Sequence, residues 1–204
     1  MDFSLLETMR IDGGLVVRRE QHLARAAAGA AHFGFRWDGT AAERALDEAV
    51  AAHPDGVWRL RLLVAPSGAA STICSEHAGD SRVWRVALAP EGVDSRDELL
   101  RHKTTRRDLY NRARATHPDL DDVVLWNERG EITESTIANV VVELDGAWYT
   151  PPLSCGLLPG VFRAAVLAAD MVRERVVTKD DLRRATRIWL INSLREWIPA
   201  SLVP

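Results

Sequence analysis

Alternating hydrophobic and polar positions at the start of the chain predict a β-hairpin. Residues 3–11 alternate as a strand, Asp12-Gly13-Gly14 is a typical turn sequence, and residues 15–18 return as a second strand. Two alanine-rich segments follow, residues 20–33 and then a second one with Thr40 as N-cap, and both repeat apolar positions at the helical period. The chain therefore opens with a hairpin and two helices.

Three further strands are expected at residues 57–65, 70–77 and 83–90, separated by turn sequences rich in Pro, Ser, Gly and Asp. The simplest packing for this order of elements places both helices against one antiparallel sheet. The predicted class is α+β, with a small domain over residues 1–95 and a larger domain over residues 96–204.

The second domain is predicted to begin with a helix that Pro118 ends, and then to become mainly β-structure. Its expected strands cover residues 122–127, 136–144, 147–150, 174–177 and 187–194. A glycine- and proline-rich loop, PPLSCGLLPG, leads into a predicted helix at residues 161–171, and Thr178 is expected to cap a short helix.

Composition and charge exclude several functions. The net charge of −3 supplies no field that would attract nucleic acid or an anionic membrane surface, and no apolar run approaches the roughly 20 residues of a membrane helix. Six histidines show no pairing at metal-ligand spacing, so no metal is expected, and the two cysteines are interpreted as reduced structural thiols. A cytoplasmic protein without nucleic-acid or membrane partners is expected.

Lysine is almost absent from the chain. Of the 26 basic Lys and Arg residues only Lys103 and Lys179 are lysines, which leaves 24 arginines. Arginine can replace lysine as a solvated charge but cannot form a Schiff base, so each remaining lysine is a candidate for amine chemistry. Lys103 lies among other basic residues, a setting that favours a nucleophilic amine, although runs of charge are usually solvated connectors.

Five separated blocks resemble a known family. They are FSLLETMRIDGG near the start, HLAR at residues 22–25, RHKTTRRDLY around Lys103, ITESTIANVVVELDGAWYTPPLSCGLLPGVFR at residues 132–163, and INSLR at residues 191–195. Together they resemble the class IV aminotransferases, the fold-type IV enzymes that depend on pyridoxal 5'-phosphate (PLP). The resemblance implies the two-domain D-amino-acid aminotransferase-like fold, with a small N-terminal domain and a larger domain around a barrel-like β core.

The resemblance also implies roles for single residues. Lys103 would carry PLP covalently, Glu134 would lie at the pyridine nitrogen, and Arg25 of the H-x-x-R motif would bind the phosphate. Further cofactor contacts are implied for Asn139, for the helix start at Val161 and Phe162, and for Asn192 and Ser193. Many relatives carry a hydroxyl residue at the position of Phe162, so Asn192 or Ser193 is expected to compensate.

Within this family the blocks are most similar to 4-amino-4-deoxychorismate lyases, especially the lyase domain fused to aminodeoxychorismate synthase component I. The implied reaction releases pyruvate and 4-aminobenzoate for folate biosynthesis, and Thr8, Arg106 and Arg195 are candidate substrate contacts. A homodimer and a functional association with aminodeoxychorismate synthase are implied as well. Two alternatives stay open: an aminotransferase for D- or branched-chain amino acids, and a non-catalytic binding protein that keeps the fold.

The branched-chain enzymes are the less similar alternative. The tyrosine that they place shortly after the lysine is Asp108 here, and Tyr110 has a different helical phase. Many relatives also carry an additional N-terminal strand segment before the first block, so a sheet edge left open or covered by a partner is expected.

Overall fold

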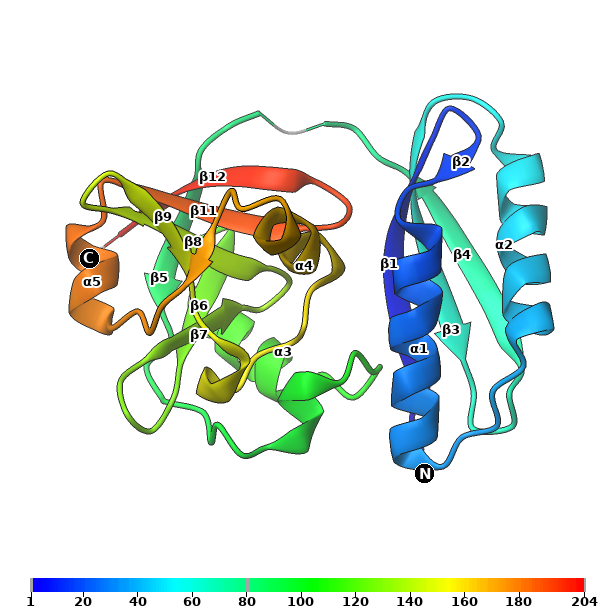
Figure 1. Cartoon of the computed structure of the whole chain (residues 1–204), viewed down its shortest axis with the longest axis horizontal. Coiled ribbons are helices and arrows are strands. Elements are labelled where there is room, and N and C mark those ends of the chain that lie inside the picture. The colour runs from blue at the N-terminus through cyan, green and yellow to red at the C-terminus, as the bar shows by residue number, and fades with distance from the viewer. Residues whose placement is uncertain (1, 80, 204) are drawn as a thin grey trace. The chain divides into compact units, whose positions relative to one another are not determined.

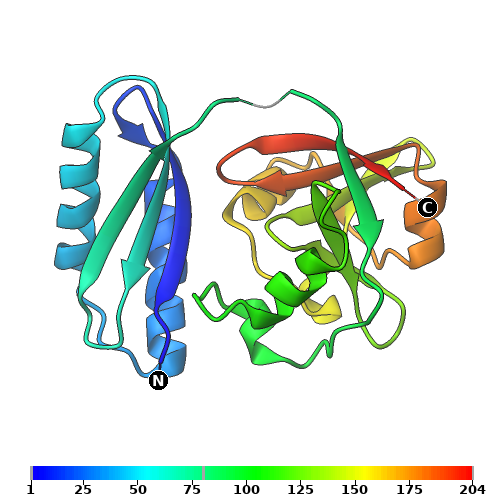
Figure 2. The same cartoon turned by 180° about the vertical axis from the view of Figure 1, so that it is seen from behind.

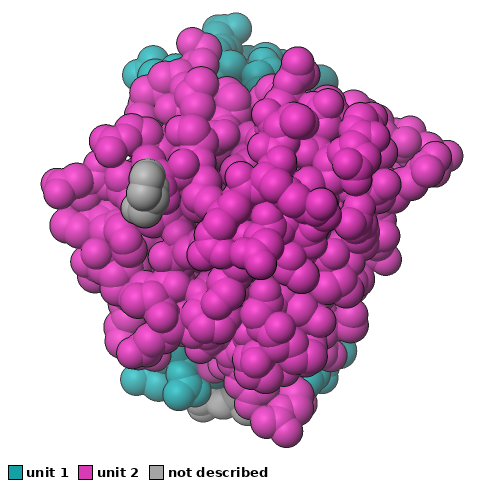
Figure 3. Space-filling model, turned by 90° about the vertical axis from the view of Figure 1, so that its left-hand side faces the viewer, with its two compact units in different colours: residues 1–79, 102–106 teal, residues 80–101, 107–204 magenta. Residues whose placement is uncertain are grey.

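The computed structural model of the chain describes residues 2–79 and 81–203. The chain forms two compact units, one of residues 1–79 with 102–106 and the other of residues 80–101 with 107–204 (Figure 3). The first unit therefore includes a short segment from later in the sequence, residues 102–106, which contains Lys103. The predicted domain boundary after residue 95 concerns folding domains rather than contact units, and it stays a prediction.

The first unit is a four-stranded antiparallel sheet with two helices on one face (Figures 1 and 2). The strand order is β2-β1-β3-β4. The elements are β1 (Leu5–Asp12), β2 (Leu15–Val16), α1 (Arg19–Phe33), α2 (Gly39–Ala52), β3 (Val57–Val64) and β4 (Ala70–Glu76). Alternate residues of β1 and β3 and the apolar stripes of both helices form a common core, which includes Leu5, Met9, Ile11, Ala30, Leu46, Leu60 and Leu62.

The segment that contains Lys103 extends the edge of β1. Leu6 donates its N–H to the Lys103 carbonyl at 2.9 Å, Thr105 donates to the Ser4 carbonyl at 2.9 Å, and Leu5 and Thr104 form an antiparallel bridge. Backbone hydrogen bonds therefore fix Lys103 beside the residue that precedes Glu7, although 96 positions separate Lys103 from Glu7 in the sequence.

The second unit is built on a closed sheet. Its strand order is β10-β9-β8-β11-β12-β5-β6-β7, and an additional β7–β8 pairing closes β8, β11, β12, β5, β6 and β7 into a barrel. The strands are β5 (Trp84–Leu88), β6 (Asp122–Trp126), β7 (Ile132–Ser135), β8 (Asn139–Leu144), β9 (Ala147–Thr150), β10 (Arg173–Glu174), β11 (Arg187–Asn192) and β12 (Glu196–Leu202). Valine, isoleucine and leucine fill its core, as expected for strands that are buried on both faces.

Short helices surround this barrel. They are η1 (Glu98–Arg101), α3 (Asp108–Ala115), η2 (Leu153–Cys155), α4 (Val161–Ala168) and α5 (Lys179–Arg184) (Figure 1). The predicted α+β class, with a small N-terminal part and a larger part around a barrel-like β core, is confirmed.

The strand predicted at residues 83–90 forms as β5 (Trp84–Leu88), but it lies in the barrel, parallel to β12 and β6, rather than in the antiparallel sheet expected with the first helices. The strand predicted at residues 136–144 begins only at Asn139, and a separate strand that was not predicted, β7 (Ile132–Ser135), precedes it.

Three further local predictions are corrected by the structure. The N-cap of α2 is Asp38, whose side chain accepts the N–H of Ala41 at 2.9 Å, rather than Thr40. Strand β12 (Glu196–Leu202) was not predicted, because Pro199 and the polar residues of EWIPASL conceal its alternation. The strand predicted at residues 174–177 is present only as the short β10 (Arg173–Glu174).

Within residues 2–79 and 81–203, no helix is both long and apolar enough to cross a membrane. The same residues contain no group of three or more His, Cys, Asp or Glu side chains arranged to hold a metal ion.

Candidate active site

A buried ionic cluster lies in the first unit between β1 and α1. Glu7 and His22 are 2% and 0% exposed, and Arg25, one helical turn after His22, is 15% exposed through its side chain. Glu7 accepts from Arg25 Nε at 2.9 Å and Arg25 Nη2 at 2.5 Å, and its Oε2 lies 2.7 Å from His22 Nδ1. The H-x-x-R spacing thus puts both side chains of α1 onto one carboxylate of the sheet.

The charges of this cluster are strongly coupled. Burial alone would raise the pKa of Glu7, but the positive charge of Arg25 and the hydrogen bonds from His22 and Arg25 lower it to about 2. Burial lowers the pKa of His22, against the hydrogen bond to Glu7 and its charge, and Arg25 and Lys103 lower it further. The cluster therefore contains an anionic Glu7, a cationic Arg25 and a neutral His22 near pH 7.

Lys103 belongs to the same electrostatic neighbourhood. Its backbone is bonded to β1 beside Glu7, its side chain is half-buried, and its charge is among those that act on His22. The structure thus brings together Lys103 and Arg25, two residues predicted for the site, around Glu7 and His22, for which no role was predicted.

In the second unit, Glu134 is a buried carboxylate, 4% exposed, near the end of β7. Its Oε1 accepts the hydroxyl proton of Tyr110 at 2.7 Å. The guanidinium of Arg107 lies over the Tyr110 ring at 4.6 Å and donates to the Thr136 carbonyl. Burial raises the pKa of Tyr110 well above its ordinary value, and the neighbouring charge of Glu134 raises it further, so Tyr110 remains the proton donor of the pair.

Asn139 lies directly opposite Glu134, since β7 and β8 pair through these two residues. Its amide donates to the Leu158 carbonyl at 2.9 Å, and a Cβ on Gly160 would meet Asn139 Oδ1 at 1.9 Å. Asn139 therefore braces the loop before α4. The turn after Glu134 is closed by Ser135, through hydrogen bonds with Ala138.

The helix α4 begins at Val161, and Gly160 is its N-cap without a side-chain cap. Val161 and Phe162 are buried at 7% and 6% exposure, and their N–H groups lie in the first turn, at the positive end of the helix. The side chain of Phe162 packs edge-on against Trp197, with ring centroids 5.9 Å apart. A first turn of this kind, next to a close glycine contact, can bind an anion through backbone amides.

The INSLR motif forms the connection from β11 to β12. Asn192 Oδ1 accepts the N–H groups of Leu194 at 3.1 Å and Arg195 at 2.9 Å, and its amide reaches the Ile137 carbonyl at 3.5 Å. Ser193, beside it, is 7% exposed. In this unit the structure therefore places the Asn192 connection against the Glu134–Asn139 turn.

The candidate substrate contacts have different surroundings. Thr8 lies in β1 opposite Arg61, and Arg106 is exposed next to Thr104 in the segment that returns to the first unit. In the second unit, the Arg195 guanidinium lies 5.4 Å from the centre of the Trp84 ring.

Sequence reasoning missed Glu7 and Tyr110. Glu7 falls in the strand pattern of FSLLETMR, where a buried carboxylate gives no signal without knowledge of its partners on α1. Tyr110 was considered only in comparison with the tyrosine of the branched-chain enzymes, and its hydrogen bond to Glu134 was not predicted. The one hint in the sequence was that Glu7 falls on the same face of the alternating strand as Leu5 and Met9.

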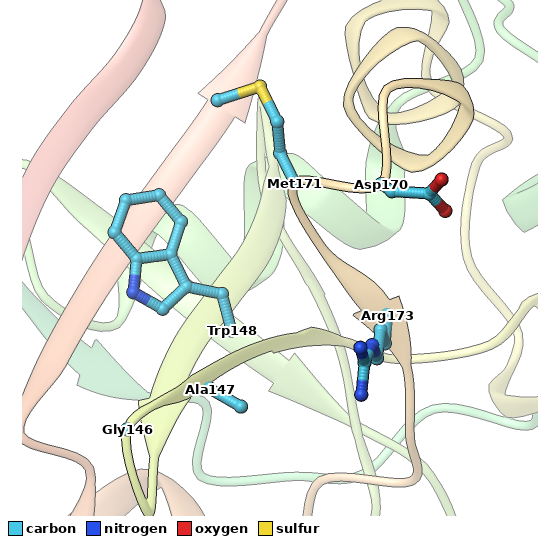
Figure 4. Close-up of a pocket in the computed structure, with 6 residues that line it drawn as sticks. All are labelled: Gly146, Ala147, Trp148, Asp170, Met171 and Arg173. Carbon is cyan, nitrogen blue, oxygen red and sulfur yellow. The ribbon is translucent and has the colours of Figure 1, made fainter.

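A surface hollow of about 440 Å³ lies elsewhere in the second unit (Figure 4). Gly146, Ala147, Trp148, Asp170, Met171 and Arg173 line it. None of the predicted site residues is among them, so we assign it no part in the chemistry.

Comparison with known proteins supports one family. The model of the family described as amino-transferase class IV matches residues 4–203 of the chain. A provisionally named aminodeoxychorismate lyase of Schizosaccharomyces pombe is 30% identical over 95% of this chain and 87% of that protein.

Solved structures agree with this assignment. A provisionally named amino-acid aminotransferase of Mesorhizobium loti superposes with a TM-score of 0.93 at 42% identity, covering 99% of this chain and all of the other. The 4-amino-4-deoxychorismate lyase of Pseudomonas aeruginosa superposes with a TM-score of 0.79 at 24% identity, covering 98% of this chain and 82% of the other, and shows the same fold. The predicted fold-type IV architecture is confirmed.

Proposed function

Because the chain belongs to the class IV aminotransferase family, whose members depend on PLP, we propose that it is a PLP-dependent 4-amino-4-deoxychorismate lyase. Membership of this family supports the view that the chain is an enzyme. The choice of the lyase reaction is our proposal. The observation that carries the proposal is the S. pombe relative named as such a lyase, which is similar over 95% of this chain.

The residues present fit the cofactor. PLP needs a primary amine, a carboxylate at its pyridine nitrogen and donors for its phosphate. Lys103 supplies the amine, and the buried Glu134 gains a positive partner if a pyridinium N–H lies beside it. Arg25 offers a planar cation, and the first-turn N–H groups of Val161 and Phe162 offer backbone donors at the positive end of α4.

When bound, PLP links to an amine through its aldehyde and withdraws electrons from the carbon that carries this amine. Lys103 would hold the cofactor through its amine and would give up this link to the 4-amino group of the substrate, and the freed amine is then the group proposed to remove the proton from C4. Loss of this proton and cleavage of the C–O bond on the adjacent carbon would release the enolpyruvyl group, which takes up a proton to become pyruvate, and would leave the ring aromatic as 4-aminobenzoate. We thus propose Lys103 as the nucleophile, the base and the amine that displaces the product.

Further contacts to the cofactor are proposed for Asn139, Val161, Phe162, Asn192 and Ser193. The two substrate carboxylates require cations beyond the phosphate site, and Arg106 and Arg195 are proposed for them, with Thr8 as a hydroxyl contact. We also propose a cytoplasmic homodimer that serves folate biosynthesis with aminodeoxychorismate synthase; size-exclusion chromatography with light scattering tests the dimer.

The test has two stages. Purified protein is first mixed with PLP and reduced with borohydride, and peptide mapping is expected to find the label on Lys103, with Lys179 as internal control. Lys103→Ala is expected to abolish labelling, while Lys179→Ala retains it. A wild-type protein that takes up no PLP would contradict every PLP-dependent function.

The second stage measures pyruvate and 4-aminobenzoate release from 4-amino-4-deoxychorismate. An amino-acid aminotransferase is the second candidate, because the Mesorhizobium loti relative with that provisional name is 42% identical over nearly the whole chain. Amino transfer to 2-oxo acids without lyase turnover would establish the second candidate and reject the first.

A further inference from the structure

Tyr110 occupies a defined place beside the proposed cofactor carboxylate. It lies in the first turn of α3, and its hydroxyl donates to Glu134 Oε1 at 2.7 Å across 24 positions of sequence. A carboxylate has two oxygens, so a donor that holds Oε1 fixes the rotation of the group and with it the direction of Oε2. Hydrogen bonds to a charged acceptor are stronger than those between neutral groups, so this one is able to decide such an orientation.

Arg107 fixes Tyr110 in turn. Its guanidinium lies 4.6 Å from the centre of the Tyr110 ring and donates to the carbonyl of Thr136, two residues after Glu134. Two side-chain contacts thus join the start of α3 to the end of β7: Tyr110 to Glu134, and Arg107 to the carbonyl of Thr136. The phenol is therefore restrained on both its ring face and its hydroxyl.

The phenol keeps its proton under ordinary conditions. Burial and the charge of Glu134 both raise the pKa of Tyr110 above its ordinary value. Glu134 is therefore supported as an anion by a neutral donor, which adds no competing charge where a pyridinium would bind.

We propose that Tyr110 is a positioning residue for the cofactor, which orients the Glu134 carboxylate toward the pyridine nitrogen by binding its other oxygen. The inference rests on the proposed function. It gives Tyr110 a role that the sequence did not indicate, and it assigns Arg107 the task of restraining the phenol.

The test measures binding rather than turnover. Pyridoxamine 5'-phosphate has the pyridine nitrogen but no aldehyde, so its dissociation constant reports non-covalent contacts without the link to Lys103. Tyr110→Phe is expected to raise this constant about ten-fold, which corresponds to about 1.4 kcal/mol, because Glu134 is no longer held in the orientation that meets the pyridine nitrogen. Glu134→Gln is expected to raise the dissociation constant as well. In the Glu134→Gln background, the additional Tyr110→Phe change is expected to raise it less than two-fold further.

The matched control is Tyr149→Phe, since Tyr149 is the only other tyrosine of the chain. It lies in β9, where its ring contacts the Arg175 guanidinium at 5.0 Å, and its removal is expected to leave the constant unchanged. An unchanged constant in Tyr110→Phe, or a full ten-fold loss added to that of Glu134→Gln, would overturn the positioning role. Failure of the wild type to bind both PLP and pyridoxamine 5'-phosphate would instead reject the proposed function.

A second measurement leaves Tyr110 in place. Tyr149→Phe protein produced with 3-fluorotyrosine carries its only fluorine label at Tyr110. Addition of pyridoxamine 5'-phosphate is expected to move the fluorine resonance, and Glu134→Gln to suppress most of the movement. A resonance that does not respond to the bound ligand would overturn the inference even if Tyr110→Phe failed to fold.

Discussion

Glu7 accepts two hydrogen bonds from one edge of the Arg25 guanidinium, from Nε at 2.9 Å and from Nη2 at 2.5 Å. Two of the three nitrogens of Arg25 are thus directed by the sheet. An anion that binds Arg25 has to approach Nη1 or the second proton of Nη2, so Glu7 restricts the direction from which a phosphate can be held.

Loss of the Glu7 charge is expected to destabilise the first unit. Glu7→Gln keeps the shape of the side chain but leaves Arg25 without its carboxylate and disturbs His22, two groups that are largely buried. Removal of one partner from a buried ion pair costs about 3–5 kcal/mol, and we expect the lower part of this range because Arg25 keeps 15% of its side chain in water. Urea unfolding monitored by fluorescence measures the change.

The control for this prediction is Asp12→Asn. Asp12 pairs with Arg10 at 2.6 Å, but their side chains are 47% and 28% exposed, so the expected loss is at most about 1 kcal/mol. Equal losses in Glu7→Gln and Asp12→Asn would show that burial of the cluster does not determine its contribution.

Acid is expected to weaken the same cluster. The pKa of Glu7 falls from 4.5 to about 2 on folding, although burial opposes the shift, because Arg25 and His22 favour the carboxylate. The unfolded chain therefore binds more protons between these values, so the stabilisation is complete above pH 4.5 and is lost as the pH falls toward 2. A shift of about 2.5 units at 1.36 kcal/mol each corresponds to roughly 3 kcal/mol.

The measurement is the difference in unfolding free energy between wild type and Glu7→Gln from pH 7 to pH 2. The difference is expected to shrink below pH 4.5, and contributions of other carboxylates cancel in it. His22 acts with the same sign at higher pH: burial lowers its pKa, so its contribution declines as the pH falls below 6.5. A difference that is constant across this range would refute the assignment of a charged Glu7.

The sequence predicted elements whose signals are local. The hairpin, the two first helices, the strands of the first unit and the capping role of Thr178 are all present, because alternation, helical period and cap chemistry act within a few residues. Strand β12 escaped prediction since its register depends on β11 and β5, which lie elsewhere in the sequence.

The motifs predicted single residues of the candidate site, but they did not predict the contacts of these residues with one another or with their neighbours. Motif resemblance indicated Arg25 and Glu134, while their partners Glu7 and Tyr110 lie 18 and 24 positions away. These contacts form only because the fold brings α1 next to β1 and Tyr110 of α3 next to Glu134 of β7. Such contacts are set by tertiary packing, for which a single sequence carries little signal.

The cap of α5 offers a test of local stability. Thr178 Oγ1 accepts the N–H of Asp181 at 3.1 Å, and the Asp181 carboxylate accepts the Thr178 N–H at 2.9 Å. Thr178→Ala is expected to cost about 1 kcal/mol of unfolding free energy, because one orphan N–H loses its acceptor. Thr178→Ser keeps the oxygen and is expected to lie within a few tenths of wild type. If both variants lost the same amount, the missing methyl group rather than the cap would be responsible.

Gly160 permits the contact between Asn139 and the start of α4. A Cβ at Gly160 would lie 1.9 Å from Asn139 Oδ1, so Gly160→Ala has to displace an amide that is 4% exposed and bonded to the Leu158 carbonyl. We expect a loss of about 1–3 kcal/mol in unfolding free energy from overpacking and the broken hydrogen bond. Gly79→Ala is the control, since nothing lies within 4 Å of its added Cβ.

A double-mutant cycle isolates the cause. Asn139→Ala removes the atom that the new Cβ would meet, so the additional loss from Gly160→Ala is expected to fall below about 0.5 kcal/mol in that background. An undiminished loss would place the strain in the backbone of the helix start instead. Glycine at position 160 would then be required by the backbone of the helix start, and not by the contact with Asn139.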